Sequence, residues 1–387
     1  MRYVYKKPHV RALMRAYDTF GRFFLRRRLR RLSGPPRRIA LLLLHQIGDA
    51  IMALPTIQAV GKAFPDAELH VIIGSIAERL LAPSLSGATL HCFDAAWDAT
   101  VKHTFGAESP EGSESALGNL LLRLQPDAAL AFHPDVRVNR ALGVSRIPIS
   151  IAFGNAGGGF WLTDVVDMPV SGHQVERNFA LARRLGKVCG VDFGLPGAPR
   201  LSISEEASAS VREQLGDSSG QRLAALHPFG RFSSRNWSIE GWAAVIGAIE
   251  GRGMIPALIG GPKDSASQFL ERSTRAIDMT GKLSLPETAA LLKMCGLFVG
   301  IDSGPGHIAA AVGCPVVCVF SAANTPERWA PFGDNVEVVT PQGINREQLP
   351  LEVTDLAEGV TTNPYTEGIT PEGVIVAIEK VLKRAGK

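Results

Sequence analysis

Short apolar segments of strand length alternate with helical stretches along most of this chain, and this alternation limits the possible folds more than any other feature. One series begins at Ile39 and a second at Leu223, with a segment rich in proline and glycine, 194–200, between them. Continuous apolar runs of about four to eight residues are typical of parallel strands that are buried on both faces. Strands that alternate with helices build doubly wound sheets. The sequence therefore predicts an α/β fold with two domains.

The same pattern gives the expected domain boundaries. We predict an N-terminal arm over residues 1–36, a Rossmann-like domain over 37–195, a second Rossmann-like domain over 201–370, and a C-terminal helix over 371–387. Packing of this last helix back on the first domain is left open. Ligands of doubly wound sheets bind beyond the carboxyl ends of the strands. Two facing domains of this kind predict a cleft lined by the loops that follow the strands.

The N-terminal arm differs from the rest of the chain in its charge. Thirteen of the 41 Lys and Arg residues lie in the first 38 positions, which hold a single acidic residue, Asp18. A basic amphipathic helix can lie in the headgroup region of a membrane, where each Lys or Arg near anionic lipid contributes about 1 kcal/mol. We predict such a helix and a contact with a membrane surface; an arm that is solvated or packed on its own domain is the alternative. The apolar residues at helical spacing are Val10, Leu13, Met14, Tyr17, Phe20, Phe24 and Leu32.

Several other classes of protein are disfavoured by the composition. No apolar run approaches the roughly 18 to 20 residues that span a bilayer, and the N-terminus lacks the apolar core and cleavage site of a signal peptide. The five cysteines are scattered among apolar neighbours, which predicts a reduced, cytoplasmic chain without a metal site. Nucleic-acid binding is not expected, because the chain has no aromatic stacking motif or recognisable reading module.

One loop between a predicted strand and a predicted helix is rich in glycine and has the sequence Gly300-Ile301-Asp302-Ser303-Gly304-Pro305-Gly306-His307. Glycines let the backbone approach a ligand closely, and the N–H groups at a helix N-terminus bind phosphate oxygens. The alternative is a tight turn in which an acidic or hydroxyl side chain only caps the helix. The serine-hydrolase elbow, the Walker A motif and the dinucleotide fingerprint are all absent. We therefore predict a diphosphate-binding loop with the contacts Asp302, Ser303, Gly304, Gly306 and His307.

A second polar loop follows the first strand of the second domain and contains Ser233, Ser234 and Arg235. An arginine binds phosphate oxygens through a forked pair of N–H donors and stays charged. Arg235 is therefore a candidate for stabilising a departing diphosphate, and the two serines are candidates for binding the donor. The alternative is a solvated loop that Trp237 anchors in the core.

The corresponding strand-to-helix turn of the first domain contains Asp49. A carboxylate at this position can accept a proton from an attacking hydroxyl group if it lies within hydrogen-bond reach. The helix N-cap is an equally good explanation of an aspartate there. Both interpretations stay open on the residue type alone.

A third loop of the second domain, 260–264, follows another predicted strand and suits the rim of a nucleoside pocket. Its Asp264 is a candidate acceptor for the hydroxyl groups of a ribose. Leu283 and the backbone near Lys282 are candidates for flanking the base. We predict these three residues as donor contacts.

Taken in order, these segments resemble glycosyltransferase family 9, the ADP-heptose:lipopolysaccharide heptosyltransferases. The resemblance runs from about Arg38 to Gly333. It implies a GT-B fold, a donor held mainly by the second domain, and inverting transfer without a metal ion or other cofactor. Asp49 then matches the proposed base of the family, and Arg235 stands where the family often has lysine. The matching segments are the turn at 47–49 and the motifs at 173–178, 235–237, 260–264, 280–285 and 302–307.

The hypothesis from the sequence is a single displacement. A hydroxyl group of a lipid-anchored saccharide acceptor, deprotonated by Asp49, attacks the anomeric carbon of ADP-heptose while ADP leaves toward Arg235. The expected place of reaction is the inner face of the bacterial inner membrane, with the basic arm as the contact. Two alternatives are the same fold with a UDP- or GDP-sugar donor, and a catalytically silent partner in envelope assembly.

Overall fold

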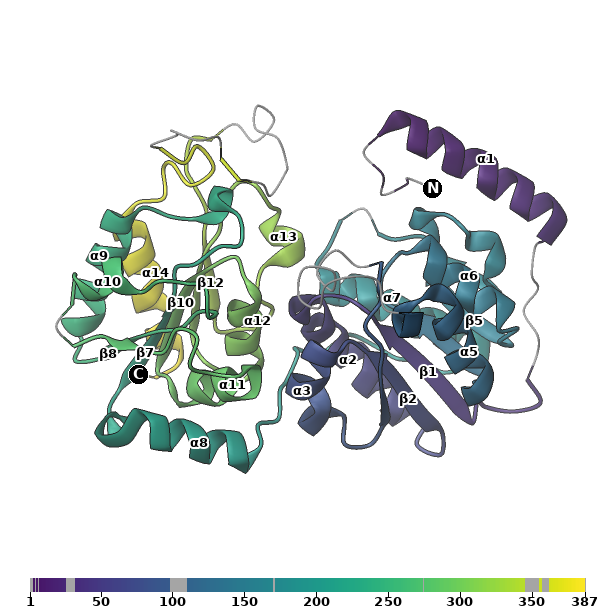
Figure 1. Ribbon diagram of the computed structural model, residues 1–387, viewed down its shortest axis with the longest axis horizontal. Helices are drawn as coiled ribbons and strands as arrows, with labels where there is room; N and C mark the ends of the chain where they lie inside the picture. Colours follow the sequence, from purple (N-terminus) through teal and green to yellow (C-terminus); the bar gives the residue numbers. More distant parts are fainter. Residues whose placement is uncertain are drawn as a thin grey trace. The chain divides into compact units, whose positions relative to one another are not determined.

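The computed structural model describes residues 3, 5, 7–25, 32–97, 110–169, 171–273, 275–344, 355–356 and 362–386. The chain divides into two compact units, Met1–Gly197 and Ala198–Lys387 (Figure 1). The division falls inside the segment 194–200, which the sequence predicts as a linker. Each unit has a six-stranded parallel sheet with helices packed on it, which confirms the predicted pair of doubly wound α/β domains.

The sheet of the first unit has the strand order β3-β2-β1-β4-β5-β6, and every neighbouring pair is parallel. In the middle of the sheet, Leu41 of β1 lies beside Val71 of β2 on one side and Leu130 of β4 on the other. The strand order reverses between β1 and β4, which is where doubly wound sheets bind their ligands. The strands are β1 (Arg38–Leu43), β2 (Glu68–Ile73), β3 (Thr89–Cys92), β4 (Ala128–Ala131), β5 (Ile149–Phe153) and β6 (Asp164–Val166).

Helices cover both faces of this sheet. On one face, α5 (Glu114–Leu124) and α6 (Val136–Val144) bury Leu121 and Leu142 against Leu42 of β1. On the other, α2 (Ile47–Ala63) and α7 (Gln174–Cys189) pack against each other and against β1 and β5. The other described helical segments are α1 (Pro8–Leu25), α3 (Ser75–Leu81), η1 (Ala82–Leu85), η2 (Pro110–Gly112), η3 (Gly154–Ala156) and η4 (Gly159–Trp161).

The sheet of the second unit repeats the plan with the order β12-β11-β10-β7-β8-β9, again parallel throughout. Val299 of β10 lies beside Leu226 of β7 at the reversal of strand order. The loops that follow these two strands carry Asp302 and Arg235, so they begin next to each other. The strands are β7 (Leu223–His227), β8 (Ile255–Leu258), β9 (Ile277–Asp278), β10 (Leu297–Ile301), β11 (Val316–Val319) and β12 (Val336–Val339).

The C-terminal helix α14 (Pro371–Arg384) packs on the sheet of its own unit. Packing of this helix back on the first domain was left open, but Val374, Ile378 and Val381 join the core of the second unit, where α14 contacts β11, β12 and α9. The apolar stripe of α14 thus finds a sheet face in its own unit. The other helical segments of this unit are α8 (Glu205–Leu215), η5 (Gly216–Gly220), η6 (Ser233–Arg235), α9 (Ile239–Glu250), α10 (Ser267–Leu270), α11 (Leu285–Met294), α12 (Gly304–Ala311) and α13 (Pro326–Trp329).

The N-terminal helix α1 runs from Pro8 to Leu25, whereas the apolar residues at helical spacing in the sequence extend from Val10 to Leu32. Residues 26–31, which hold five of the arginines of the arm, lie outside the described residues. No helix in the described ranges combines the length and the apolar composition that crossing a membrane requires.

Candidate active site

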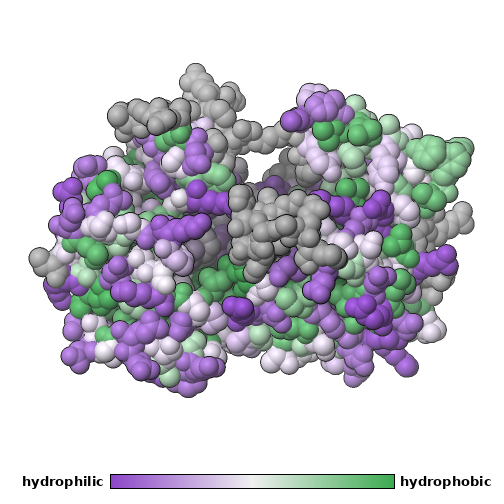
Figure 2. Space-filling model, viewed as in Figure 1, coloured by the Kyte–Doolittle hydropathy of each residue, from purple (hydrophilic) through white to green (hydrophobic). Residues whose placement is uncertain are grey.

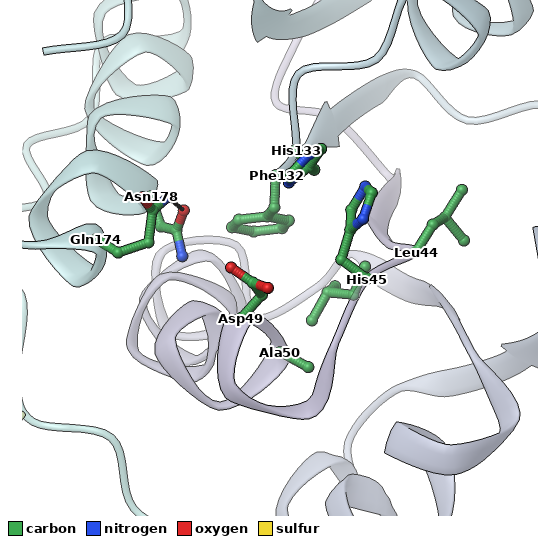
Figure 3. A pocket seen from close by; sticks show the side chains of 9 residues that line it. Leu44, His45, Asp49, Ala50, Phe132, His133, Gln174 and Asn178 are labelled. Atoms are coloured by element: carbon green, nitrogen blue, oxygen red, sulfur yellow. Dashed lines mark hydrogen bonds between the residues drawn. The ribbon is translucent and has the colours of Figure 1, made fainter. Parts of the chain in front are cut away.

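Asp49 lies in the first turn of α2, shortly after the end of β1. The N-cap position of α2 belongs to Gln46, so Asp49 does not serve as the N-cap. The turn is held in place because α2 is buried from Ala50 to Ile57 and packs against α7. In Figure 3 the carboxylate of Asp49 points into a hollow with about 280 Å³ of empty space. The residues that line it are Leu43, Leu44, His45, Asp49, Ala50, Phe132, His133, Gln174 and Asn178.

Two buried amide side chains form one wall of this hollow. Helix α7 begins with a capping box of His173 and Glu176 and has one buried face. That face carries Gln174 and Asn178, which are only 4% and 2% exposed, and Gln174 Nε2 donates to Asn178 Oδ1 at 2.9 Å. Buried amides are costly unless they are hydrogen-bonded. In the sequence analysis the motif at 173–178 contributes only to the family resemblance, and neither amide is predicted as a site residue. Two amides four residues apart on a buried helix face are the signal that could have identified them.

Two histidines form the opposite wall. The rings of His45, after β1, and His133, after β4, stack with their centroids 3.4 Å apart, and neither was predicted as a site residue (Figure 3). Nearby, Asp135 caps α6 and accepts three hydrogen bonds from Arg137. Burial acts to raise the pKa of Asp135, but the hydrogen bonds and charge of Arg137 outweigh it and lower the pKa. The Asp49 carboxylate thus shares its hollow with amide and imidazole groups, which can donate or accept hydrogen bonds to a ligand rich in hydroxyl groups.

In the second unit, the glycine-rich loop leads directly from β10 into α12, as the sequence predicts. Ser303 occupies the N-cap position of α12 but makes no side-chain cap bond. The carboxylate of Asp302 is turned into the protein, where it accepts a hydrogen bond from Asn324 Nδ2 at 2.8 Å. The alternative in which Asp302 or Ser303 serves only as a helix cap is therefore not what the structure shows. Within this first turn, the N–H of Gly306 donates to the backbone oxygen of Ser303 at 3.2 Å, and Pro305 has no N–H group.

Arg235 and Asp302, predicted from separate loops, are brought into contact. One terminal nitrogen of Arg235 donates to the backbone oxygen of Asp302 at 2.8 Å, and the other lies 3.7 Å from its carboxylate. The Nε of Arg235 is buried and has no hydrogen-bond partner among the described residues. Burial raises the pKa of Asp302, against the opposing charge of Arg235 and the bond from Asn324. The contact fixes the guanidinium at the start of the 302–307 loop.

His227, at the end of β7, supports the same loop and was not predicted. Its Nδ1 lies 3.1 Å from Ser303 Oγ, which also donates to the backbone oxygen of Ile301 at 3.1 Å. Burial lowers the pKa of His227 to about 4. The ring is therefore neutral near pH 7 and holds the Ser303 hydroxyl through an uncharged hydrogen bond.

The two serines before Arg235 have structural contacts that the sequence did not indicate. Ser234 is fully buried in this structure, and its role as a donor contact stays a prediction. Its backbone oxygen accepts a hydrogen bond from Ser321 Oγ at 2.7 Å. The hydroxyl of Ser233 accepts one from the backbone N–H of Leu356 at 2.7 Å. Both serines therefore hold the loop that carries Arg235.

The remaining residues of the 302–307 loop differ in how much space surrounds them. A Cβ added at Gly304 would meet no protein atom within 4 Å, so the backbone there is open to a ligand. At Gly306 the added Cβ would lie 3.2 Å from Pro331, which leaves little room for a larger residue. His307 is buried in the first turn of α12.

The predicted nucleoside contacts come from two adjoining loops. Asp264 accepts a hydrogen bond from the backbone N–H of Gly261 at 2.7 Å and, with Lys263, lines a second hollow at the ends of β7 and β8. Gly281, with φ of +68°, packs on Pro262, and a Cβ there would lie 2.9 Å from Pro262 Cα. This close approach brings the turn with Lys282 and Leu283 against the Asp264 loop. Neither Lys282 nor Leu283 lines the hollow itself, and Lys282 Nζ donates to the backbone oxygen of Asp278 at 2.6 Å.

Side chains suited to a resident metal ion do not gather in the described structure. Within its ranges no group of three or more His, Cys, Asp or Glu residues is arranged to hold one. Arg235 places a positive charge beside the 302–307 loop.

A family model described as glycosyltransferase family 9 (heptosyltransferase) matches residues 144–353, more than half of the chain. The chain belongs to glycosyltransferase family 9. The match contains the loop of Arg235 and the 302–307 loop of this glycosyltransferase. The Asp49 turn lies before the matched segment, so the family match itself supports the second unit more than the first.

Curated relatives and solved structures agree with this assignment. A lipopolysaccharide heptosyltransferase 3 of Escherichia coli K12 is 29% identical over 62% of this chain and 68% of its own length. A second E. coli protein of that name is 25% identical over 87% of this chain and 96% of its own length. The crystal structure of a family 9 glycosyltransferase from Veillonella parvula DSM 2008 has a TM-score of 0.75 and 20% identity, covering 92% of this chain and 100% of that one. This last likeness shows the shared GT-B type of fold.

Proposed function

We propose that this glycosyltransferase transfers a heptose from ADP-heptose to a saccharide of the lipopolysaccharide core, with inversion at the anomeric carbon and without a metal ion. The observation that carries the proposal is the contact of Arg235 with Asp302, which fixes a guanidinium at the start of the 302–307 loop. A guanidinium beside helix N-terminal N–H groups provides the positive charge that a diphosphate needs. The function named for the two E. coli relatives supports the choice of sugar and acceptor.

The proposed reaction is a single displacement. The acceptor hydroxyl oxygen forms a bond to the anomeric carbon as the bond from that carbon to the diphosphate oxygen breaks. Asp49 takes the proton of the hydroxyl group, and the electron pair of the broken bond leaves with ADP, whose charge Arg235 and the loop N–H groups stabilise. Such charge stabilisation and positioning supply most of the rate when no covalent intermediate forms.

We propose a positioning role for Asn178 beside Asp49. The Gln174 amide holds the oxygen of Asn178 by a hydrogen bond, so the NH₂ group of Asn178 faces away from Gln174. In Figure 3 this nitrogen lies on the side of the hollow where the Asp49 carboxylate points. An amide donor there favours the carboxylate rotamer that accepts a proton from a hydroxyl group in the hollow.

The place of reaction is proposed from the same relatives and from the basic arm. A lipopolysaccharide-core acceptor is anchored in a membrane, so its transferase works at the membrane surface. We propose that this chain does so as a peripheral protein on the cytoplasmic face of the inner membrane, with α1 as the contacting element.

The donor is tested by calorimetric titration of the full chain with ADP, UDP, GDP and CDP in the presence of a chelator. We expect ADP to bind most tightly and Arg235→Gln to weaken its binding at least about tenfold, since a charge-assisted hydrogen bond contributes about 1.5 to 3 kcal/mol. Arg231→Gln is the matched control, because Arg231 is an exposed arginine of the same loop that lies over Phe232.

The outcomes separate the alternatives. A preference for UDP or GDP keeps the fold and the phosphate loop but replaces the donor. Binding that appears only when a divalent cation is added contradicts metal independence. If no nucleotide binds, the chain is better explained as a catalytically silent partner in envelope assembly.

A further inference from the structure

Helix α1 is docked on the first unit by one of its faces. This face carries Val10, Met14, Tyr17, Asp18 and Gly21, and it packs on the segment that contains η3 and η4. The ring of Tyr17 meets that of Phe160 edge-on at 5.0 Å, and its hydroxyl oxygen accepts a hydrogen bond from Trp161 Nε1 at 2.9 Å. Gly21 lies so close to Phe160 that a Cβ there would clash with the ring.

The centre of this docked face is the single acidic residue of the arm. Asp18 is 3% exposed; one carboxylate oxygen accepts a hydrogen bond from the backbone N–H of Gly158 at 2.7 Å, and the other accepts one from Tyr3 at 2.7 Å. Burial, together with Asp18, raises the pKa of Tyr3 to about 12. Gly157 and Gly158 have φ of +87° and +73°, a conformation that favours glycine. The side chain of Met14 packs against Gly157, where a Cβ would clash with it. The glycine-rich segment 154–159 is thus the docking site of α1.

A second face of α1 remains exposed. It carries Leu13, Phe20, Phe23 and Phe24, which we call the apolar ridge and which are 69%, 65%, 84% and 62% exposed. The ring of Phe24 contacts those of Phe20 and Phe23, with centroids 4.5 and 4.9 Å apart. In Figure 2 hydrophobic residues gather on the surface over α1, at the upper right. The sequence placed Val10, Met14 and Tyr17 on the same face as Leu13, Phe20 and Phe24; the structure separates them.

The exposed surface of α1 is also basic. Arg11, Arg15 and Arg22 fall in one row at helical spacing, and the small side chains of Ala12, Ala16 and Thr19 separate this row from the apolar ridge. Asp18, the one carboxylate of the helix, is turned into the protein. In the sequence, Arg26, Arg27, Arg28, Arg30 and Arg31 follow directly.

We infer that the apolar ridge and the arginine row form one lipid-binding surface, which inserts into the headgroup region of an anionic bilayer while the opposite face of α1 stays docked on the first unit. Aromatic side chains beside arginines without a carboxylate complement anionic headgroups above an apolar interior. Because the Asp18 contacts fix the rotation of α1, the helix carries the first unit to the membrane in one orientation. The inference rests on the proposed membrane association, but not on the donor or the catalytic residues.

Co-flotation of the purified full chain with vesicles tests this surface. The vesicles are phosphatidylcholine alone, or phosphatidylcholine mixed with phosphatidylglycerol. The ridge variant is Phe20→Ser/Phe23→Ser/Phe24→Ser. Its matched control is Leu122→Ser/Val144→Ser/Leu195→Ser, which removes three comparably exposed apolar side chains elsewhere on the first unit.

We expect the native chain and the control to float with the phosphatidylglycerol vesicles. The partition coefficient of the ridge variant should fall about 100-fold, because three phenylalanines are removed from the apolar region. That of Arg15→Gln/Arg22→Gln should fall about 20-fold, and only with the anionic vesicles. Flotation of the ridge variant equal to that of the native chain would overturn the inference. A second result would also overturn it: the native chain fails to float and self-associates in sedimentation, and the ridge variant does not self-associate. A second copy of the chain would then cover the ridge.

The same proteins separate this inference from the proposed activity. Transfer to a water-soluble, deacylated acceptor needs no membrane, so the ridge variant should retain it. A chain that floats but transfers no heptose disproves the activity alone, and a chain that transfers heptose but does not float disproves the lipid-binding surface alone.

Discussion

Each of the two units has an aspartate after a central strand of its sheet, but the two carboxylates lie in different surroundings. After β1, Asp49 is directed into a hollow among amide and imidazole groups (Figure 3). After β10, Asp302 is buried and bonded to Asn324 and Arg235. In the proposed reaction the first carboxylate meets the acceptor, whereas the second holds the guanidinium that meets the diphosphate. Position in the fold therefore does not decide the chemistry of a residue; its hydrogen-bond partners do.

The largest expected effect is on turnover and comes from Asp49→Asn. The variant keeps the shape of the side chain but cannot accept the proton, and a general base contributes roughly 100- to 10,000-fold. We expect turnover to fall on the order of 1,000-fold, measured by release of ADP, while ADP affinity and thermal midpoint stay unchanged. Turnover within a few fold of the native enzyme would remove Asp49 as the base.

The pH dependence of stability tests the support of the second loop. The pKa of His227 is lowered to about 4 from 6.5, so the unfolded chain binds the proton more readily. The contribution of the neutral ring is full above about pH 6.5 and is lost as the pH falls toward 4, which amounts to about 3 kcal/mol. When the free energy of unfolding is measured by denaturant at several pH values, His227→Asn should not show this decrease between pH 6.5 and 4. Parallel pH curves for the two proteins would contradict a buried, neutral His227.

The counterpart of the Asp49 variant is Asp302→Asn. It leaves Arg235 without its carboxylate and should lower the free energy of unfolding by about 2 kcal/mol, since a buried charged hydrogen bond is lost. ADP affinity should fall with it, in contrast to Asp49→Asn. Thermal unfolding and calorimetry check both effects. An Asp302→Asn variant with native stability and native ADP affinity would abolish the contrast between the two aspartates.

The smallest expected effect is that of Arg235→Lys, which keeps the charge but not the fork. Arg235 uses one nitrogen to bind the backbone oxygen of Asp302 and another to approach its carboxylate. A lysine has a single nitrogen and cannot make both contacts in this way. We expect ADP affinity to fall about tenfold and turnover to survive. Loss of turnover as severe as that of Asp49→Asn would show that Arg235 does more than bind the leaving group.

The sequence predicts the framework of the fold because its signals are local. Continuous apolar runs mark the central strands, and the Pro- and Gly-rich segment marks the division of the chain. Asp302, Ser303 and Arg235 could be proposed because glycine, hydroxyl and guanidinium groups near strand ends are typical of phosphate-binding loops.

Other features depend on contacts between distant segments, which the sequence does not show. The spacing of Gln174 and Asn178 marks them as a pair, but their place beside Asp49 is seen only when α7 is packed against α2. Ser234 is a plausible ligand by residue type, but packing buries it. The apolar residues of α1 follow one helical period, so the docked face is seen only from contacts with a distant segment, such as that of Asp18 with Gly158.

The most direct test of the account is heptose transfer itself. The purified chain would be incubated with ADP-heptose and a lipopolysaccharide-core acceptor in a chelator, and the product examined by mass spectrometry and NMR spectroscopy. We predict an acceptor extended by one heptose with inverted anomeric configuration, formed by the native chain and not by Asp49→Asn. Product with retained configuration, or equal product from both proteins, would contradict a single displacement in which Asp49 takes the proton.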